Sequence, residues 1–181
     1  MRFTPTALAG AWLVDLDAHP DERGFFARTF CAREFEDHGL PTELPQANLS
    51  RNRRAGTLRG MHVNADWHAE AKLVRCSRGA IHDVIVDLRR DSPTYLDHVA
   101  VDLDAERCNA LFVPAAFAHG FITLVDDTDV EYGMSAIFAP TAARGFRWND
   151  PAFGISWPVQ PVVISARDAS YPDFDRAILE H

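Results

Sequence analysis

The sequence lacks long hydrophobic runs, paired cysteines and an excess of basic charge. No stretch approaches the length of a membrane span, and the opening segment MRFTPTALAGAWLVDLDAHPDERG has no apolar run suited to a secretion signal. We therefore expect a cytoplasmic protein without membrane attachment. The net charge of -8 argues against nucleic-acid binding through a basic field, although a few converging basic residues could still hold an anionic metabolite.

Cysteine is scarce and unpaired. The three cysteines, Cys31, Cys76 and Cys108, are far apart and odd in number, and no CxxC pair is present. This pattern favours reduced thiols in a reducing compartment and gives no support to a thiolate zinc site.

What the chain does contain is a series of short strand-like segments. Its length and its 47% apolar content fit one domain spanning residues 1–181, without repeats or linkers. Strands are expected within 11–19, 23–30, 55–63, 72–90, 95–104, 110–116, 119–127, 128–138 and 145–148, and short helices within 32–40 and 171–180. Within 72–90, Ser77-Arg78-Gly79 is typical of a hairpin turn. The pattern predicts an all-β sandwich or barrel such as a jelly roll, with a few short helices.

One of these strands, IHDVIVDLR, carries an acid on an apolar face. Ile81, Asp83 and Ile85 share one side of a regular strand, and Val84 and Val86 share the other. A buried acid at this position needs a partner. Either the face of Asp83 is half exposed, or Asp83 lines a ligand-filled barrel interior.

The stretch RGMHVNADWHAEAKLVR (59–75) gathers histidines, an acid and basic residues, which suggests a metal centre. The candidate ligands are His62, His68, Glu70 and, further along, His119. In the metal-binding jelly rolls called cupins, two histidines stand one residue apart on a strand, whereas His62 and His68 are six apart with a turn-like segment between them. We therefore favour a solvated loop for His68 and Glu70, and we predict no metal.

A second interpretation of the same stretch is proton transfer. Removing and returning a proton beside a carbonyl needs a base, a carboxylate, a cation and an acid. The chain offers these side chains in the histidines of the stretch and in Lys72, His119, Tyr132 and Asp168. Each has an ordinary alternative: a strand tyrosine is usually packed, and an aspartate in SARD is often a helix cap. Spacing alone does not decide between them.

The order of motifs resembles a known family. DERGFF, QANLS, TLRGMH, AKLVRC, DVIVDLRRDSPT, FVPAAFAHGF, VEY, FAP, RWNDP and ISWP follow one another as in the dTDP-4-dehydrorhamnose 3,5-epimerases, over roughly residues 20–168. The resemblance implies a cupin-type jelly roll, a homodimer, and neither metal nor cofactor. It also implies epimerisation of a 4-keto-6-deoxy nucleotide sugar by deprotonation beside the ketone.

The resemblance assigns roles to particular residues. It implies His62 as the base, Asp168 as its partner, Tyr132 as the acid and Lys72 beside the sugar ketone, with Arg59 and His119 at the diphosphate and sugar and with Arg23, Gln46 and Asn48 at the nucleotide. Arg59 and His62 would face opposite sides of a regular strand. We therefore predict a bulge at Gly60 that turns both toward one pocket.

The sequence also departs from the family pattern. The departures are Val63-Asn64 after the base, Arg28 in place of an acid, Gly133 after the tyrosine, Ile137-Phe138 before AP, and Ala143 in place of a glutamate. The catalytic set is intact and the recognition set is altered, so the nucleotide or sugar is open, and Arg28 is either a diphosphate contact or a surface residue. Inversion of one carbon, a GDP- or UDP-linked sugar, a metal-dependent cupin enzyme and a non-catalytic sugar-binding jelly roll are the alternatives.

Overall fold

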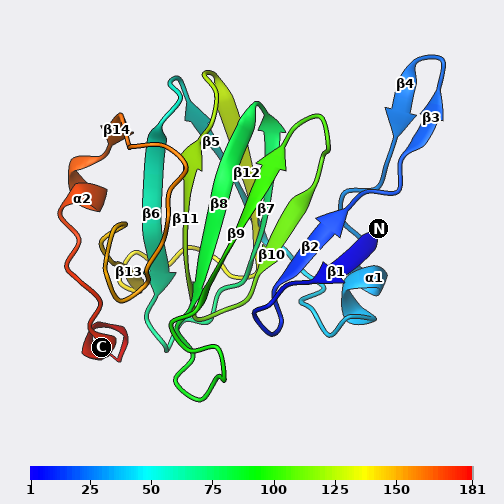
Figure 1. The fold of residues 1–181 in the computed structure, drawn as a ribbon. Helices are drawn as coiled ribbons and strands as arrows, with labels where there is room; N and C mark the ends of the chain where they lie inside the picture. The colour runs from blue at the N-terminus through cyan, green and yellow to red at the C-terminus, as the bar shows by residue number, and fades with distance from the viewer. Residues whose placement is uncertain (181) are drawn as a thin grey trace.

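The computed structural model describes residues 1–180, and two six-stranded sheets face each other within them (Figure 1). In spatial order the first sheet contains β1 (Arg2–Pro5), β2 (Trp12–Asp15), β10 (Ala110–Val113), β7 (Lys72–Arg78), β12 (Thr128–Met134) and β5 (Gln46–Asn52). The second contains β13 (Ala143–Gly145), β6 (Thr57–Asn64), β11 (Phe117–Thr123), β8 (Ala80–Asp87) and β9 (His98–Asp104), with β14 (Val163–Ile164) parallel to β6. The predicted all-β jelly roll is confirmed.

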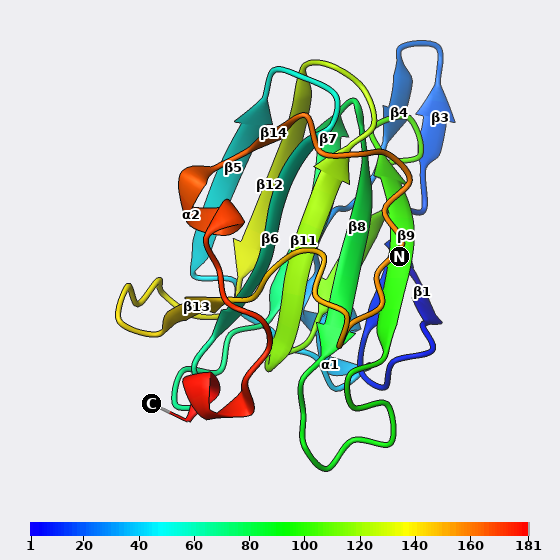
Figure 2. The same cartoon turned by 60° about the vertical axis from the view of Figure 1, so that its left-hand side comes forward.

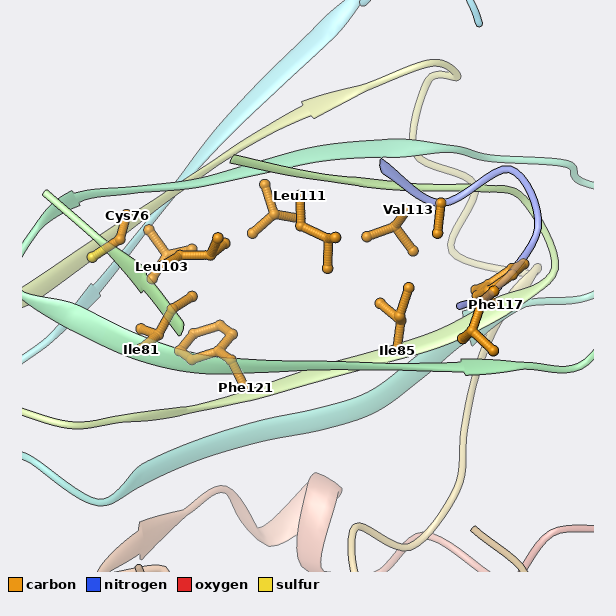
Figure 3. Packing of buried hydrophobic residues seen from close by; sticks show 12 residues of the cluster. Cys76, Ile81, Ile85, Leu103, Leu111, Val113, Phe117 and Phe121 are labelled. Atoms are coloured by element: carbon orange, nitrogen blue, oxygen red, sulfur yellow. The ribbon is translucent and has the colours of Figure 1, made fainter. Parts of the chain in front are cut away.

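The main core fills the space between the sheets (Figure 3). Cys76 and Leu111 reach it from the first sheet, and Ile81, Ile85 and Phe121 reach it from the second. The alternation of β8 explains this arrangement, because every second residue of a strand points to the same face. Asp83 has the same parity as the two isoleucines and is fully buried, so the half-exposed face is excluded and Asp83 belongs to the interior between the sheets.

The other face of the second sheet is covered by the C-terminal part of the chain. Val84 and Val86 of β8 pack there with Phe146, Phe153 and Leu179 in a second cluster. The segment then continues through β14 and α2 (Ala166–Ala169), which lie beside β6 (Figure 2), and ends in the 3-10 helix η1 (Arg176–Leu179). This second core therefore fixes the C-terminal segment against the strand that carries His62.

The N-terminal part covers the first sheet and then leaves the body of the molecule. Phe35 of α1 (Ala32–Glu36) is fully buried against Phe112 of β10. Between β2 and α1, strands β3 (His19–Asp21) and β4 (Gly24–Phe26) form a hairpin that projects away from both sheets (Figure 1). Phe25 and Phe26 on it are exposed, which is unusual for two adjacent large apolar side chains.

The turn at Gly79 is not the predicted hairpin. β7 pairs with β10 and β12, whereas β8 pairs with β9 and β11 in the facing sheet. Gly79 has φ +78°, and a Cβ on it would lie 2.4 Å from the Thr128 hydroxyl oxygen. A tight glycine turn is therefore present, but it carries the chain from one sheet to the other, a distinction that local turn residues do not encode.

The predicted helices are shorter than the sequence pattern suggested. The helix expected over 32–40 ends at Glu36, and only Arg176–Leu179 of the segment 171–180 is helical, as a 3-10 turn. Helix α2 and strands β1, β3, β5 and β14 were not predicted, because each is brief or polar. The strand expected over 145–148 is wrong, since β13 ends at Gly145. None of the helices found in residues 1–180 has the length and apolar character to cross a membrane.

Candidate active site

A pocket of about 280 Å³ lies between the two sheets, and each sheet supplies one of its walls. The first sheet contributes Asn48, Leu49, Ser50, Lys72, Tyr132 and Met134, and the second contributes Arg59, His62, His119 and Phe121. The pocket thus collects six of the residues singled out from the sequence. Leu49, Ser50, Phe121 and Met134 were not foreseen. For Ser50, Phe121 and Met134 the signal was available, since each lies two residues along a strand from a predicted site residue.

His62 is paired with Asp168. The His62 Nε2 lies 3.0 Å from Asp168 Oδ1, and the Asp168 side chain is almost fully buried. Asp168 stands in the first turn of α2, where Ser165 caps the helix by accepting the Asp168 N–H. The cap is therefore Ser165, and the aspartate is free to face β6.

Asp168 is held in its ionised form. Burial alone would raise the pKa of its carboxyl group, but hydrogen bonds from His62, from the Gly60 N–H at 3.2 Å and from Ser165 outweigh burial and lower the pKa below its ordinary value. A carboxylate at this position makes Nε2 of a neutral His62 the protonated nitrogen. The other ring nitrogen, Nδ1, is then the one that can accept a proton.

The predicted irregularity at Gly60 is confirmed. His62 pairs with His119 and Arg59 pairs with Phe121, so between these pairs two residues of β6 oppose one of β11. Gly60 has φ +139°, and the Gly60–Met61 peptide is cis. The extra residue reverses the usual alternation, and both Arg59 and His62 consequently line the same pocket.

Tyr132 faces the pocket from the opposite wall, in β12. Burial raises the pKa of its hydroxyl well above the ordinary value, and the negative charge of Asp83 raises it further, while Arg59 and Ser50 oppose the shift. The hydroxyl therefore carries its proton throughout the neutral range. Tyr132 also packs edge-on against His119, with ring centroids 6.2 Å apart.

His119 belongs to a second, deeper histidine–aspartate pair. Its Nε2 lies 2.7 Å from Asp83 Oδ1, and both side chains are buried. The acid noted between two isoleucines on β8 thus has its partner, a histidine that lines the pocket. The pair fixes the imidazole of His119 at the pocket wall.

Comparison with known proteins agrees with this geometry. Residues 5–176 match the family model described as dTDP-4-dehydrorhamnose 3,5-epimerase. An enzyme of that name from Sinorhizobium fredii is 40% identical over 173 residues, which cover 95% of this chain and 89% of the relative. The chain belongs to the dTDP-4-dehydrorhamnose 3,5-epimerase family. It is therefore an isomerase.

Solved structures give the same result. An epimerase of this name from Bacillus anthracis, crystallised with TDP and PPi, is 36% identical with a TM-score of 0.92, covering 96% of this chain and 99% of that one. A 3'-monoepimerase from Streptomyces bikiniensis in complex with dTDP-quinovose is 34% identical with a TM-score of 0.86, covering 97% of this chain and 88% of that one. Both structures match this chain over nearly its whole length.

Three of the four metal-ligand candidates of the epimerase have other partners, and the fourth, His68, is half-buried with no hydrogen-bond partner for its Nε2 within residues 1–180. His62 is bound to Asp168 and His119 to Asp83, while Glu70 forms an ion pair with Lys72 at 2.8 Å. The prediction of a solvated loop is wrong for Glu70, whose side chain is only 4% exposed. Within residues 1–180, no group of three or more histidine, cysteine or acidic side chains is arranged to hold a metal ion.

The predicted nucleotide contacts divide into two groups. Asn48 lines the pocket. The Gln46 side-chain amide donates from Nε2 to Asn48 Oδ1 at 3.2 Å, and its Oε1 accepts the Phe138 N–H at 2.9 Å. Arg59 donates from Nε to Asn52 Oδ1 at 2.8 Å, and the structure of residues 1–180 gives its terminal guanidinium nitrogens no further partner. Asn48 and Arg59 therefore line the pocket, and Gln46 is hydrogen-bonded to Asn48 beside it.

Arg23 and Arg28 do not join the pocket within one chain. Arg23 is 83% exposed on the projecting hairpin and is bound to Asp21. Arg28 forms a surface ion pair with Glu34 at 2.8 Å, beside a separate cavity near the N-terminus. In a single chain, Arg28 is therefore the surface arginine that the sequence allowed.

A smaller cavity of about 170 Å³ adjoins the main pocket and shares His62, Lys72 and Met134 with it. Its remaining lining includes four of the positions that depart from the family pattern, together with two arginines: Val63, Asn64, Phe138, Ala143, Arg144 and Arg167. The departures are thus clustered in space, next to the base.

Proposed function

We propose that this epimerase inverts C3 and C5 of a 4-keto-6-deoxyhexose carried on a nucleoside diphosphate, with His62 as base and Tyr132 as acid. One observation carries the proposal: His62 and Tyr132 line one pocket from opposing sheets. A sugar ring lying between the sheets presents one face to each residue. Inversion at carbon requires removal of a proton from one face and delivery to the other.

The first step breaks the C–H bond beside the ketone. Nδ1 of His62 takes the proton, the electron pair moves to the carbonyl oxygen, and Asp168 stabilises the imidazolium that forms. The Lys72 ammonium donates to the developing enolate oxygen. The ketone itself acidifies the neighbouring protons, so the step needs no cofactor.

The second step rebuilds the C–H bond on the other face. Tyr132 gives its proton to the carbon as the enolate collapses to the ketone, and solvent then restores the proton of Tyr132 and removes that of His62. The raised pKa of Tyr132 supports this role, because the hydroxyl is protonated when the enolate forms. Repetition at the second carbon gives the doubly inverted product.

The substrate is proposed to be dTDP-linked. The B. anthracis relative holds TDP, and a relative from Legionella pneumophila, 31% identical, holds dTDP-4-keto-L-rhamnose. The departures around the adjoining cavity support the alternative of a UDP- or GDP-linked sugar. Calorimetric titration with dTDP, UDP and GDP separates the two, since a clear preference for dTDP would end the idea of a changed nucleotide.

We propose further that the enzyme is a homodimer in which the projecting hairpin serves the pocket of a second copy. The pocket of one chain is lined by two basic side chains, Lys72 and Arg59, and Lys72 is paired with Glu70. A further cation would strengthen the grip on a diphosphate, and Arg23 on the hairpin, beside the exposed Phe25 and Phe26, can supply it by exchanging its exposed partner Asp21 for the phosphates.

Complementation tests the exchange. Homodimers of Arg23→Ala and of His62→Ala are each expected to be weakly active. After mixing and subunit exchange, a heterodimer contains one pocket with both residues intact, so activity should reappear. Absence of recovery, with exchange verified by mass spectrometry, would place Arg23 outside the active site.

The cysteines, Cys31, Cys76 and Cys108, are all free thiols. This supports the cytoplasm as the proposed compartment of the enzyme.

Solvent deuterium incorporation tests the reaction itself. Wild type incubated in D₂O with dTDP-4-keto-6-deoxyglucose should place deuterium at C3 and C5, and His62→Ala should place none. Deuterium at one carbon only would establish a mono-epimerase, a reaction that the S. bikiniensis relative is named for. No deuterium with dTDP-, UDP- or GDP-linked sugars would contradict the proposed function.

A further inference from the structure

Glu70 and Lys72 form a buried ion pair at the edge of the pocket. The Lys72 Nζ lies 2.8 Å from Glu70 Oε1, and the side chains are 12% and 4% exposed. Ala71 between them is held by backbone and side-chain bonds to Ser135, which extend the β7–β12 ladder. In such an extended segment, residues two apart point the same way, so the sequence Glu-Ala-Lys places the carboxylate beside the ammonium.

The acid stands behind the lysine, away from the main pocket. Lys72 lines the main pocket, the adjoining cavity of about 170 Å³ and a third cavity of about 250 Å³. Glu70 lines the last two and is not part of the main pocket. A substrate in the main pocket therefore meets the ammonium and not the carboxylate.

We propose that Glu70 is a positioning residue that holds the Lys72 ammonium at the sugar carbonyl and away from the diphosphate. The inference rests on the proposed role of Lys72 at the enolate oxygen. Glu70 makes no contact in the main pocket, so it acts only through the lysine.

Two physical arguments support this role. A lysine ammonium is a point charge on a flexible stem, and beside a diphosphate it turns toward the phosphates unless another charge holds it. Glu70 takes one of its three donors and leaves two for the pocket. The other Glu70 oxygen, Oε2, has no hydrogen-bond partner within residues 1–180, so Lys72 is the group that balances the buried carboxylate.

The decisive variant is Glu70→Gln, which keeps the shape and removes the charge. Because small displacements of a catalytic group cost up to roughly 100-fold in rate, kcat should fall roughly 10- to 100-fold. KM should stay within about threefold, and dTDP should bind at least as tightly, since the released lysine charge is free to reach the phosphates. Glu70→Asp keeps the charge and should recover part of kcat.

A matched control is Asp66→Asn. Asp66 lies on the same loop and pairs with Arg176 at 2.5 Å, without contact to Lys72. It should keep kcat within about twofold. A loss of kcat in Glu70→Gln that is accompanied by an equal rise in KM, or that appears equally in Asp66→Asn, would reveal a merely structural effect and overturn the proposal.

A double-mutant cycle shows whether Glu70 acts through Lys72. In a Lys72→Met background, Glu70→Gln should cost no further activity, measured by deuterium incorporation. An undiminished additional loss would overturn the positioning role. If Lys72→Met itself retains wild-type kcat, the proposed role of Lys72 fails and the inference falls with it. If Lys72→Met is impaired while Glu70→Gln is not, the inference about Glu70 alone fails.

Discussion

Gly60 and Gly120 lie in backbone contact, one on each of the paired strands β6 and β11. A Cβ built on Gly60 would lie 2.6 Å from the Gly120 Cα, and a Cβ on Gly120 would lie 2.9 Å from the Arg59 carbonyl oxygen. The bulge that brings Arg59 and His62 to one pocket thus needs two residues without side chains, at facing positions.

Replacement of Gly60 by alanine should therefore destabilise the protein. The positive φ costs roughly 1–2 kcal/mol, and the backbone clash adds roughly 1–3 kcal/mol. Gly24 is the matched control, because it has φ +128° with nothing within 4 Å of a Cβ. Thermal unfolding should show a Tm several degrees lower for Gly60→Ala than for Gly24→Ala. Equal Tm values would show that β6 and β11 accommodate the added methyl group without loss of stability.

Asp168→Asn should cost roughly 10²- to 10⁴-fold in kcat, because the amide neither fixes the tautomer of His62 as the carboxylate does nor balances the imidazolium. Initial rates of product formation measure the effect. Asp173→Asn serves as the control, since Asp173 is an exposed partner of Arg147. A loss smaller than about tenfold would mean that His62 does not depend on its aspartate.

The lowered pKa of Asp168 also predicts a pH dependence of stability. A carboxyl group whose pKa is lower in the folded than in the unfolded state stabilises the fold at pH values above its ordinary value of 3.8. That contribution is lost as pH falls through the folded-state pKa. Urea unfolding of wild type and Asp168→Asn should give a free-energy difference that is constant near neutrality and shrinks below about pH 4. A difference unchanged down to pH 3 would contradict the assignment.

Tyr132→Phe should separate proton exchange from inversion. His62 can still remove the proton, and the enolate can recover one from the same side, but the opposite wall no longer holds an acid. In D₂O the variant should incorporate deuterium into unreacted substrate while product formation falls roughly 10²-fold or more. NMR distinguishes the two epimers. Inverted product at the wild-type rate would assign the acid to another group.

The sequence predicted features whose cause is local. Alternation on β8 placed Asp83 with two inward isoleucines, and the spacing of Arg59 and His62 required the bulge at Gly60. In both cases the regular alternation of a strand conflicted with what the side chain needs: a partner for buried Asp83, and a shared pocket for Arg59 and His62. The order of motifs supplied the family, and with it the pair His62–Asp168, which no spacing along the chain reveals.

What the sequence did not predict depends on the tertiary arrangement. Gly79 looks the same in a hairpin and in a crossing between sheets, because the partner strands β10 and β11 are contributed by later residues. Glu70 reads as part of a polar loop, and only the packed structure shows that it is buried against Lys72. Leu49 is an exposed strand residue that lines the pocket from its rim, and nothing in its neighbours marks it.

The attachment of the C-terminal segment to β6 has a consequence for folding during synthesis. Both walls of the pocket are complete by Met134, whereas Asp168 comes later in the chain, with β14 and α2. On the ribosome, a nascent chain can therefore assemble the cavity before its base has a partner. Competence for proton removal is therefore acquired only after the strands that form both walls have been synthesised.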